Sequence, residues 1–155
     1  MSFERAALVR AAGGSHARGG SLRRRARRAQ ALGARAVINA GQTHVPEALG
    51  REHGTGDLYG IPVVQSSVFI EATGVSSVFE EIVRIAPHSA RVVVVSLHKK
   101  PALLDLQFLL MKELVARGSI GYPREFPDVI AMLADPAVDV TPIARMARSY
   151  RALPA

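Results

Sequence analysis

Three largely apolar runs in this chain carry a small, hydroxyl-bearing or glycine residue at or next to their carboxyl end, which suits the binding of a nucleotide. The runs cover residues 68–72, 91–97 and 114–121, and the first continues into Thr73-Gly74 ahead of a helical pattern. In α/β proteins, a strand that ends in a small residue and glycine before a helix holds a nucleotide at the carboxyl end of a parallel sheet. The pattern therefore predicts a nucleotide-binding edge.

The elements that position these runs alternate between strand and helix. The strand runs are nearly continuous in Val and Ile, as expected when helices cover both faces of a parallel sheet. The fold class expected is α/β. In this half of the chain we expect strands at Val68–Ala72, Arg91–Leu97, Leu103–Leu106 and Leu114–Gly121, helices at Val75–Ala86 and Arg124–Ala134, and a helical turn at Gln107–Glu113.

The first half of the chain is less regular. Residues 14–24 show neither helical nor strand periodicity and are expected to form a loop. The other elements expected are helices at Phe3–Ala12, Arg25–Leu32 and Val45–His53, a strand at Ala36–Asn39 and a loop at Gly54–Gln65. We divide the chain into a basic segment (1–35), a core (36–143) and an irregular tail (144–155).

The positive charge belongs to one end of the chain. Residues 1–35 hold nine Arg against one acid, Glu4, while the remaining residues are nearly neutral. An arginine cluster in this segment could bind phosphates, either of a nucleic acid or of NADP. No aromatic residue interleaves with the cluster and no nucleic-acid-binding motif accompanies it, which favours a solvated surface. The cluster consists of Arg18, Arg23, Arg24, Arg25, Arg27 and Arg28.

Several classes of protein and of site are disfavoured. The chain has no cysteine, which excludes disulfides, a thiol nucleophile and a cysteine zinc site. No apolar run is long enough to span a bilayer and no secretory signal is recognisable, so we expect a cytoplasmic protein with no membrane contact. The histidines are scattered, and His98, which precedes two lysines, is expected in a solvated loop. Glu71 has no identifiable partner for general-base chemistry.

The stretch from Ala31 to Ile143 resembles the coenzyme-binding Rossmann domain of zinc-dependent medium-chain alcohol and butanediol dehydrogenases. Seven short motifs occur in the order and at the spacing of that family. They are 31–34 with 36–39 (ALGA, AVIN), 70–74 (IEATG), 90–95 (ARVVVV), 97–101 (LHKKP), 110–114 (LMKEL), 118–123 (GSIGYP) and 125–130 (EFPDVI). The resemblance implies an incomplete Rossmann-like parallel sheet, with NAD or NADP as the cofactor.

The resemblance also implies roles for individual residues. The turn at 71–74 would line the adenosine side of the cofactor, the end of the next strand would lie beside the nicotinamide ring, and residues 119–121 would lie near the carboxamide. The cofactor-binding candidates are Ala72, Thr73, Gly74, Ser96, Leu97, Ser119, Ile120 and Gly121. An edge strand at Leu103–Leu106 would pair two subunits in a homodimer.

The chain departs from the family pattern in three places. The Gly-x-Gly-x-x-Gly turn that receives the pyrophosphate is absent. The acid that would bind the ribose hydroxyls falls at about Gly20, in a segment whose residue types look scrambled, as a compensated frameshift would leave them. The cysteine, histidine and acidic ligands of the catalytic zinc are also missing.

These departures set the functional expectation. We expect a truncated NAD(P)-binding domain whose parent reaction is hydride transfer between a secondary alcohol and NAD. On its own it should bind no zinc and be inactive. The alternatives are a non-catalytic remnant or subunit-association module, and a polyanion-binding protein.

Overall fold

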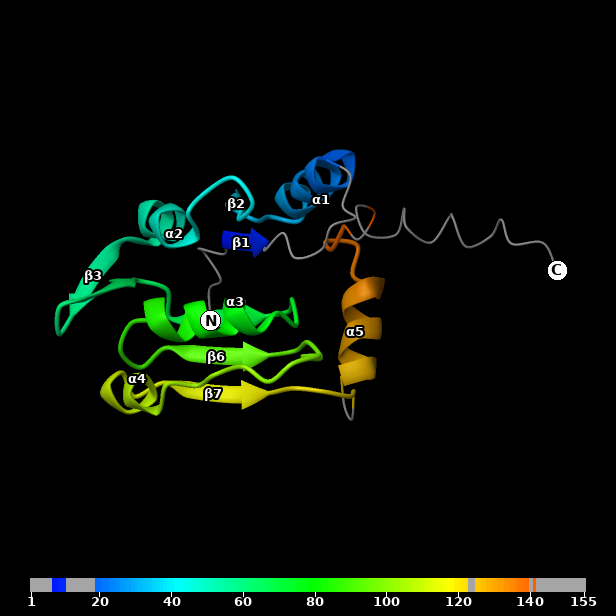
Figure 1. Ribbon diagram of the computed structural model, residues 1–155. Helices are drawn as coiled ribbons and strands as arrows, with labels where there is room; N and C mark the ends of the chain where they lie inside the picture. Colours follow the sequence, from blue (N-terminus) through cyan, green and yellow to red (C-terminus); the bar gives the residue numbers. More distant parts are fainter. Residues whose placement is uncertain (1–6, 11–18, 123–124, 140, 142–155) are drawn as a thin grey trace.

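The computed structural model describes residues 7–10, 19–122, 125–139 and 141, and within them the chain alternates strands and helices (Figure 1). The strands are β1 (Ala7–Arg10), β2 (Ala36–Asn39), β3 (Thr55–Leu58), β4 (Ile61–Val64), β5 (Val68–Glu71), β6 (Arg91–Val94) and β7 (Val115–Gly118). The helices are α1 (Gly19–Ala31), α2 (Val45–His53), α3 (Ser76–Ile85), α4 (Leu106–Met111) and α5 (Glu125–Ala134). The predicted α/β class is confirmed.

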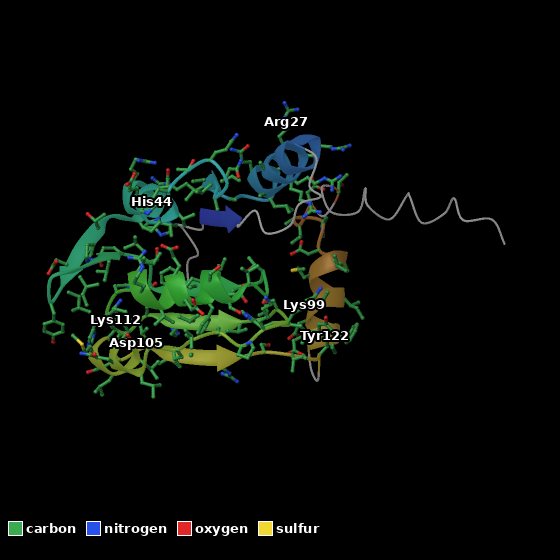
Figure 2. The ribbon with its side chains drawn as sticks, in the orientation of Figure 1. Arg27, His44, Lys99, Asp105, Lys112 and Tyr122 are labelled. Atoms are coloured by element: carbon green, nitrogen blue, oxygen red, sulfur yellow. The ribbon has the colours of Figure 1, made fainter. Side chains whose placement is uncertain are left out.

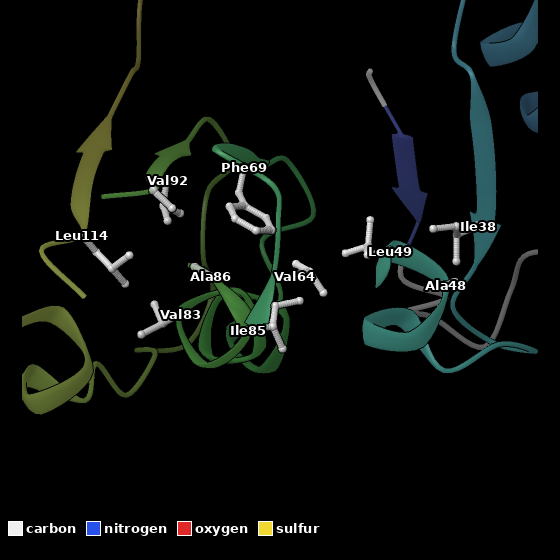
Figure 3. Close-up of a cluster of buried hydrophobic side chains, with 11 residues drawn as sticks. Ile38, Ala48, Leu49, Val64, Phe69, Val83, Ile85, Ala86, Val92 and Leu114 are labelled. Carbon is white, nitrogen blue, oxygen red and sulfur yellow. The ribbon is translucent and has the colours of Figure 1, made fainter. Parts of the chain in front are cut away.

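The centre of the structure is a three-stranded parallel sheet in the order β5-β6-β7. Its buried face packs on α3, where Phe69, Val92 and Leu114 meet Val83 and Ile85 (Figure 3). Helix α3 connects β5 to β6, and its burial against the sheet fixes where both strands end. The same apolar cluster continues through β4 and α2 to β2.

Lys112 anchors the end of α3 from inside the core. Its side chain is fully buried, and Nζ donates to the carbonyl oxygens of Val83 at 3.1 Å and of Arg84 at 2.6 Å. The ammonium also lies 4.7 Å from the centre of the Phe108 ring, beside α4 (Figure 2). These carbonyls lie at the carboxyl end of α3, where a helix has no backbone donors of its own. Burial lowers the pKa of Lys112, and the nearby charge of Arg84 lowers it further.

The amino-terminal elements differ from the sequence expectation. Residues 7–10 form strand β1, paired in parallel with β2, where we expected a helix over Phe3–Ala12, and the rest of that range lies outside the described residues. Helix α1 begins at Gly19, so residues 19–24 are helical where we expected a loop over residues 14–24. The run Ala-Leu-Val-Arg suits either a helix or a strand, and pairing with β2 decides between them.

The stretch Gly54–Gln65, expected as a loop, contains a β-hairpin. Strands β3 and β4 are antiparallel and are joined by Tyr59-Gly60, which both have positive φ (55° and 80°). This two-residue turn matches the twist of a hairpin, and the Gly60 amide donates to Asp57 Oδ1 at 2.8 Å. The four-residue strands are too short to show a clear alternation in the sequence.

The strand expected at Leu103–Leu106 is absent, because Leu103–Asp105 has no regular structure and Leu106 begins α4. The Asp105 carboxylate accepts from the Gln107 amide at 2.9 Å and so caps this helix, while the Leu103 amide donates to Glu80 Oε1 at 2.9 Å. Both hydrogen bonds are made within one chain. Homodimer formation through Leu103–Leu106 remains a prediction, but two subunits could not pair there by forming a sheet between strands.

Candidate functional site

The three parallel strands end side by side. Glu71, Val94 and Gly118 are in register across β5, β6 and β7. The hydrogen bonds continue one residue further, from the Val95 amide to Glu71 O at 2.9 Å and from the Ser119 amide to Val94 O at 3.0 Å. Segments 72–74, 95–97 and 119–121 therefore leave the sheet at one edge (Figure 1).

This edge carries all the candidates named from the sequence. Ala72, Thr73 and Gly74 follow β5, Ser96 and Leu97 follow β6, and Ser119, Ile120 and Gly121 follow β7. We call these eight residues the strand-end site. Their role in cofactor binding remains a prediction.

Gly74 joins two of these segments at a distance that needs glycine. Its φ is +69°, and a Cβ atom built there would lie 2.5 Å from the carbonyl oxygen of Leu97. The Gly74 amide donates to Ser96 Oγ at 2.9 Å. The turn after β5 is therefore in direct contact with the loop after β6, and any larger residue would force them apart.

Glu71 is the centre of this contact. The residue as a whole is only 1% exposed. Oε1 accepts hydrogen bonds from the amides of Thr73 at 2.7 Å and Gly74 at 3.0 Å, as well as from the Thr73 hydroxyl. Oε2 accepts from the Ser96 hydroxyl and from His98 Nε2. One buried acid therefore ties the turn after β5 to the loop after β6.

The hydrogen bonds keep Glu71 ionised in spite of its burial. Burial by itself raises the pKa of the carboxyl group, because a charge loses its hydration. Hydrogen bonds from Ser96, Thr73 and His98 stabilise the anion and outweigh burial, so that the pKa falls from 4.5 to about 2. The acid is therefore a permanent negative charge near neutral pH, which suits a structural tie and does not suit a general base.

His98 is not the solvated loop residue that the sequence suggested. Its side chain is 18% exposed, and Nε2 lies 2.7 Å from Glu71 Oε2, while the ring meets Phe79 edge-on with 6.4 Å between centroids. An ionised carboxylate accepts hydrogen bonds only, so Nε2 carries the proton. Nδ1 is buried without a hydrogen-bond partner among the described residues.

Little in the sequence indicates that Glu71 and His98 are paired. The two lysines after His98 are exposed, as expected of a solvated loop. Because they are charged, they suggest the same exposure for His98, which is instead largely buried. No partner for Glu71 is identifiable from the sequence, because Ser96 and His98 lie 25 and 27 residues away along the chain. The available signal was a lone acid at the end of an apolar strand, since buried acids are rarely unpaired.

The outer part of the strand-end site is open. Leu97 is 80% and Ile120 is 85% exposed, and Thr73 and Ser119 are exposed as well. A Cβ atom at Gly121 would meet nothing within 4 Å, although its φ is +82°. The site is therefore a rigid inner tie around Glu71 with an outer surface that mixes apolar side chains and backbone polar groups.

In the described part of the chain, no group of three or more His, Asp and Glu side chains could hold a metal ion, and the expectation that this chain binds no zinc remains a prediction. That part also contains no helix long and apolar enough to cross a membrane.

The arginine cluster lies partly on α1. The side chains of Arg25 and Arg27 are exposed, and Figure 2 shows Arg27 pointing away from the rest of the protein. Arg18, also in the cluster named above, lies outside the described residues.

Comparison with solved structures supports the fold. An Escherichia coli CFT073 protein described as a short chain alcohol dehydrogenase, solved with NADH, is 24% identical with a TM-score of 0.65, over 77% of this chain and 33% of that one. A Sinorhizobium meliloti 1021 protein described as a zinc-binding dehydrogenase, solved with NADP, is 20% identical with a TM-score of 0.64, over 88% of this chain and 36% of that one. At these identities the likeness shows a shared fold.

Comparison by sequence shows the family. (R,R)-butanediol dehydrogenase from Neisseria gonorrhoeae is 29% identical over 75 residues, which are 48% of this chain and 21% of that protein. The chain thus spans about a fifth of this curated relative. Residues 17–135 match the model of a family described as zinc-binding dehydrogenase. This match covers more than half of the sequence, and the chain therefore belongs to the zinc-binding dehydrogenase family.

Proposed function

We propose that this chain binds NAD or NADP at the strand-end site, as the cofactor-holding part of an alcohol or butanediol dehydrogenase. The observation that carries the proposal is the tie between Glu71 and the loops after β5 and β6. It holds two strand ends in fixed positions and leaves their outer surface open. Carboxyl ends of parallel strands are where α/β proteins bind nucleotides. Relatives of the same fold have been solved with NADH and with NADP.

The residues present fit the nicotinamide half of such a cofactor. Leu97 and Ile120 offer exposed apolar contact to a flat ring, and the exposed backbone of 119–121 offers hydrogen bonds to an amide. Ala72, Thr73 and Gly74 would lie toward the adenosine. The buried Nδ1 of His98 lacks a partner in the described structure, which fits a site that is completed by another molecule.

The pyrophosphate half fits less well. The sequence has no Gly-x-Gly-x-x-Gly turn, and this turn supplies backbone donors to the phosphates at a helix amino terminus. We therefore expect binding weaker than in a complete Rossmann site. A bound cofactor would supply the hydride carrier, while the residues of this chain would bind and orient the nicotinamide ring. Hydride transfer would also need a substrate-activating group, such as zinc, from outside the strand-end site.

A titration with NADH and NADPH tests the proposal. Leu97→Asp and Ile120→Asp place a carboxylate where the nicotinamide would lie, and both positions are exposed enough to accept it without unfolding. Tyr59→Asp is the matched control, because Tyr59 is 75% exposed at the tip of the β3–β4 hairpin. We expect the Kd to rise about tenfold or more, roughly 1.4 kcal/mol, in both site variants and to stay unchanged in the control. If the two site variants bound NADH and NADPH with the same Kd as the control and the unmodified chain, the cofactor would not bind at the strand-end site.

A second candidate function is polyanion binding by α1. This helix is basic and has no acid in its sequence, and it begins at Gly19, six residues before the expected start at Arg25. The exposed Arg25 and Arg27 would contact phosphates. Binding of nucleic acid that weakens steeply with salt, and that is lost in Arg25→Gln/Arg27→Gln, would support it. Weak binding without salt dependence would contradict it.

A further inference from the structure

The loop after β6 carries two lysines at the edge of the strand-end site. Lys99 and Lys100 are both exposed, and Figure 2 shows Lys99 at the edge where the strands end. Ser76 Oγ donates to the carbonyl oxygen of Lys100 at 3.0 Å, which fastens this loop to the start of α3, close after the turn at 72–74. The two lysines therefore lie close to the turn that would face the adenosine half of the cofactor.

The charges of these two lysines are not balanced by acids. In the described part of the chain, neither ammonium group forms an ion pair with a carboxylate. The segments that leave the strand ends, 71–76, 95–101 and 118–122, contain a single acid, Glu71, and this acid is buried. The exposed part of the strand-end site is therefore positively charged, which favours an anionic ligand.

The groups around Glu71 that could bind a ribose diol are already hydrogen-bonded. Sites for NAD use a carboxylate on the ribose hydroxyls, whereas sites for NADP place a cation beside the 2′-phosphate. Both carboxylate oxygens of Glu71 accept hydrogen bonds within the tie. The Thr73 hydroxyl donates to Glu71 and accepts from the Val75 amide at 3.1 Å, and the Ser96 hydroxyl is used in the same way between Glu71 and the Gly74 amide. This side of the site therefore offers cations and no free carboxylate.

We propose that Lys99 and Lys100 bind the 2′-phosphate of NADP, so that the strand-end site takes NADP in preference to NAD. This inference rests on the function proposed above and adds the choice between its two cofactors. A phosphate carries close to two negative charges near neutral pH and accepts charge-assisted hydrogen bonds from ammonium groups. The hydroxyl that NAD has at the same position is uncharged. The hydrogen bond from Ser76 holds the loop in place before the cofactor arrives, which lowers the entropy lost on binding.

Titrations of the unmodified chain with NADPH and NADH at low ionic strength test the inference. Two charge-assisted contacts with one phosphate should lower the Kd for NADPH about tenfold relative to the Kd for NADH. Lys99→Gln/Lys100→Gln should raise the Kd for NADPH to that for NADH and leave the Kd for NADH unchanged. Lys99→Arg/Lys100→Arg keeps both charges and should keep the preference. High ionic strength should reduce the preference, because salt screens exposed charges.

Arg25→Gln/Arg27→Gln is the matched control, because it removes two exposed positive charges from α1, and it should keep the preference for NADPH. Equal Kd values for the two cofactors in the unmodified chain, or a preference lost in the α1 variant and kept in the lysine variant, would overturn the inference and leave the proposed function in place. An equal rise of both Kd values in Lys99→Gln/Lys100→Gln would mean that the lysines contact phosphates common to both cofactors, and would also overturn it. If neither cofactor bound the unmodified chain, the proposed function itself would fail and this inference with it.

Discussion

His98 Nε2 lies 2.7 Å from Oε2 of Glu71, and twenty-seven residues separate them in the sequence. The pair joins the end of β5 to the loop after β6 from inside the protein. The contact has consequences for acid stability, because the anionic form of Glu71 is the one that its neighbours stabilise.

Acid should remove the stability that Glu71 provides. Its pKa is lowered in the folded state from 4.5 to about 2, so its contribution is complete above pH 4.5 and is lost as the pH falls toward 2. This pKa shift corresponds to roughly 3 kcal/mol in the free energy of unfolding. We expect the Glu71→Gln variant to lose about this much free energy of unfolding at pH 7, and we expect its free energy of unfolding, measured with urea, to change less with pH.

Glu81→Gln is the control for this experiment, because Glu81 pairs with Arg84 on the surface of α3. An exposed pair of this kind contributes about 0–1 kcal/mol. Parallel pH profiles for the unmodified chain and Glu71→Gln would contradict the stabilising role of Glu71.

Gly74→Ala should disrupt the contact between the loops after β5 and β6. The new Cβ atom would collide with the Leu97 carbonyl oxygen, and the positive φ adds strain, for a loss of roughly 2–5 kcal/mol. Gly121→Ala has a similar φ and open space around it, so it should lose only the roughly 1–2 kcal/mol of strain. Urea unfolding measures both, and equal losses would show that the close approach at Gly74 does not exist.

Lys112→Met should destabilise the end of α3. Methionine fills much of the same volume and leaves the carbonyls of Val83 and Arg84 without their donor, which costs about 1–3 kcal/mol. Lys99→Met is the matched control on the exposed loop after β6 and should change the free energy of unfolding by less than about 0.5 kcal/mol. If Lys112→Met left stability unchanged or raised it, the desolvation cost of burying the ammonium would be larger than the stabilisation from its two hydrogen bonds.

The sequence predicted those elements whose apolar pattern is long or uninterrupted. Strand β5 and helix α3 lie within one residue of their expected bounds, and α2 matches at both ends. The strand after α3 also begins at the expected Arg91, although it ends earlier. These elements bury side chains in one core, so their sequences repeat apolar residues at strand or helix spacing. That repeat can be recognised in a single sequence.

The errors fall where distant contacts decide the structure. β1 becomes a strand by pairing with β2, and the Leu103 amide, in a segment without regular structure, donates to Glu80 of helix α3. The strand-end residues come together at one edge of the sheet, and their role in cofactor binding remains a prediction. The tie that positions them is not legible in the sequence, because His98 looks like a loop residue until Glu71 is beside it. The spacing of residues along the chain does not show that residues at or after the ends of two different strands, such as Glu71 and His98, are in contact.

Thermal unfolding of the purified chain with and without millimolar NAD or NADP tests cofactor binding most directly. A ligand present at ten times its Kd stabilises by about 1.4 kcal/mol, which is a rise in Tm of roughly 3–6 °C for a chain of this size. We predict such a rise with at least one of the two cofactors, and its loss in Leu97→Asp. A Tm unchanged by both cofactors would contradict the proposal and leave the family membership as a statement of ancestry.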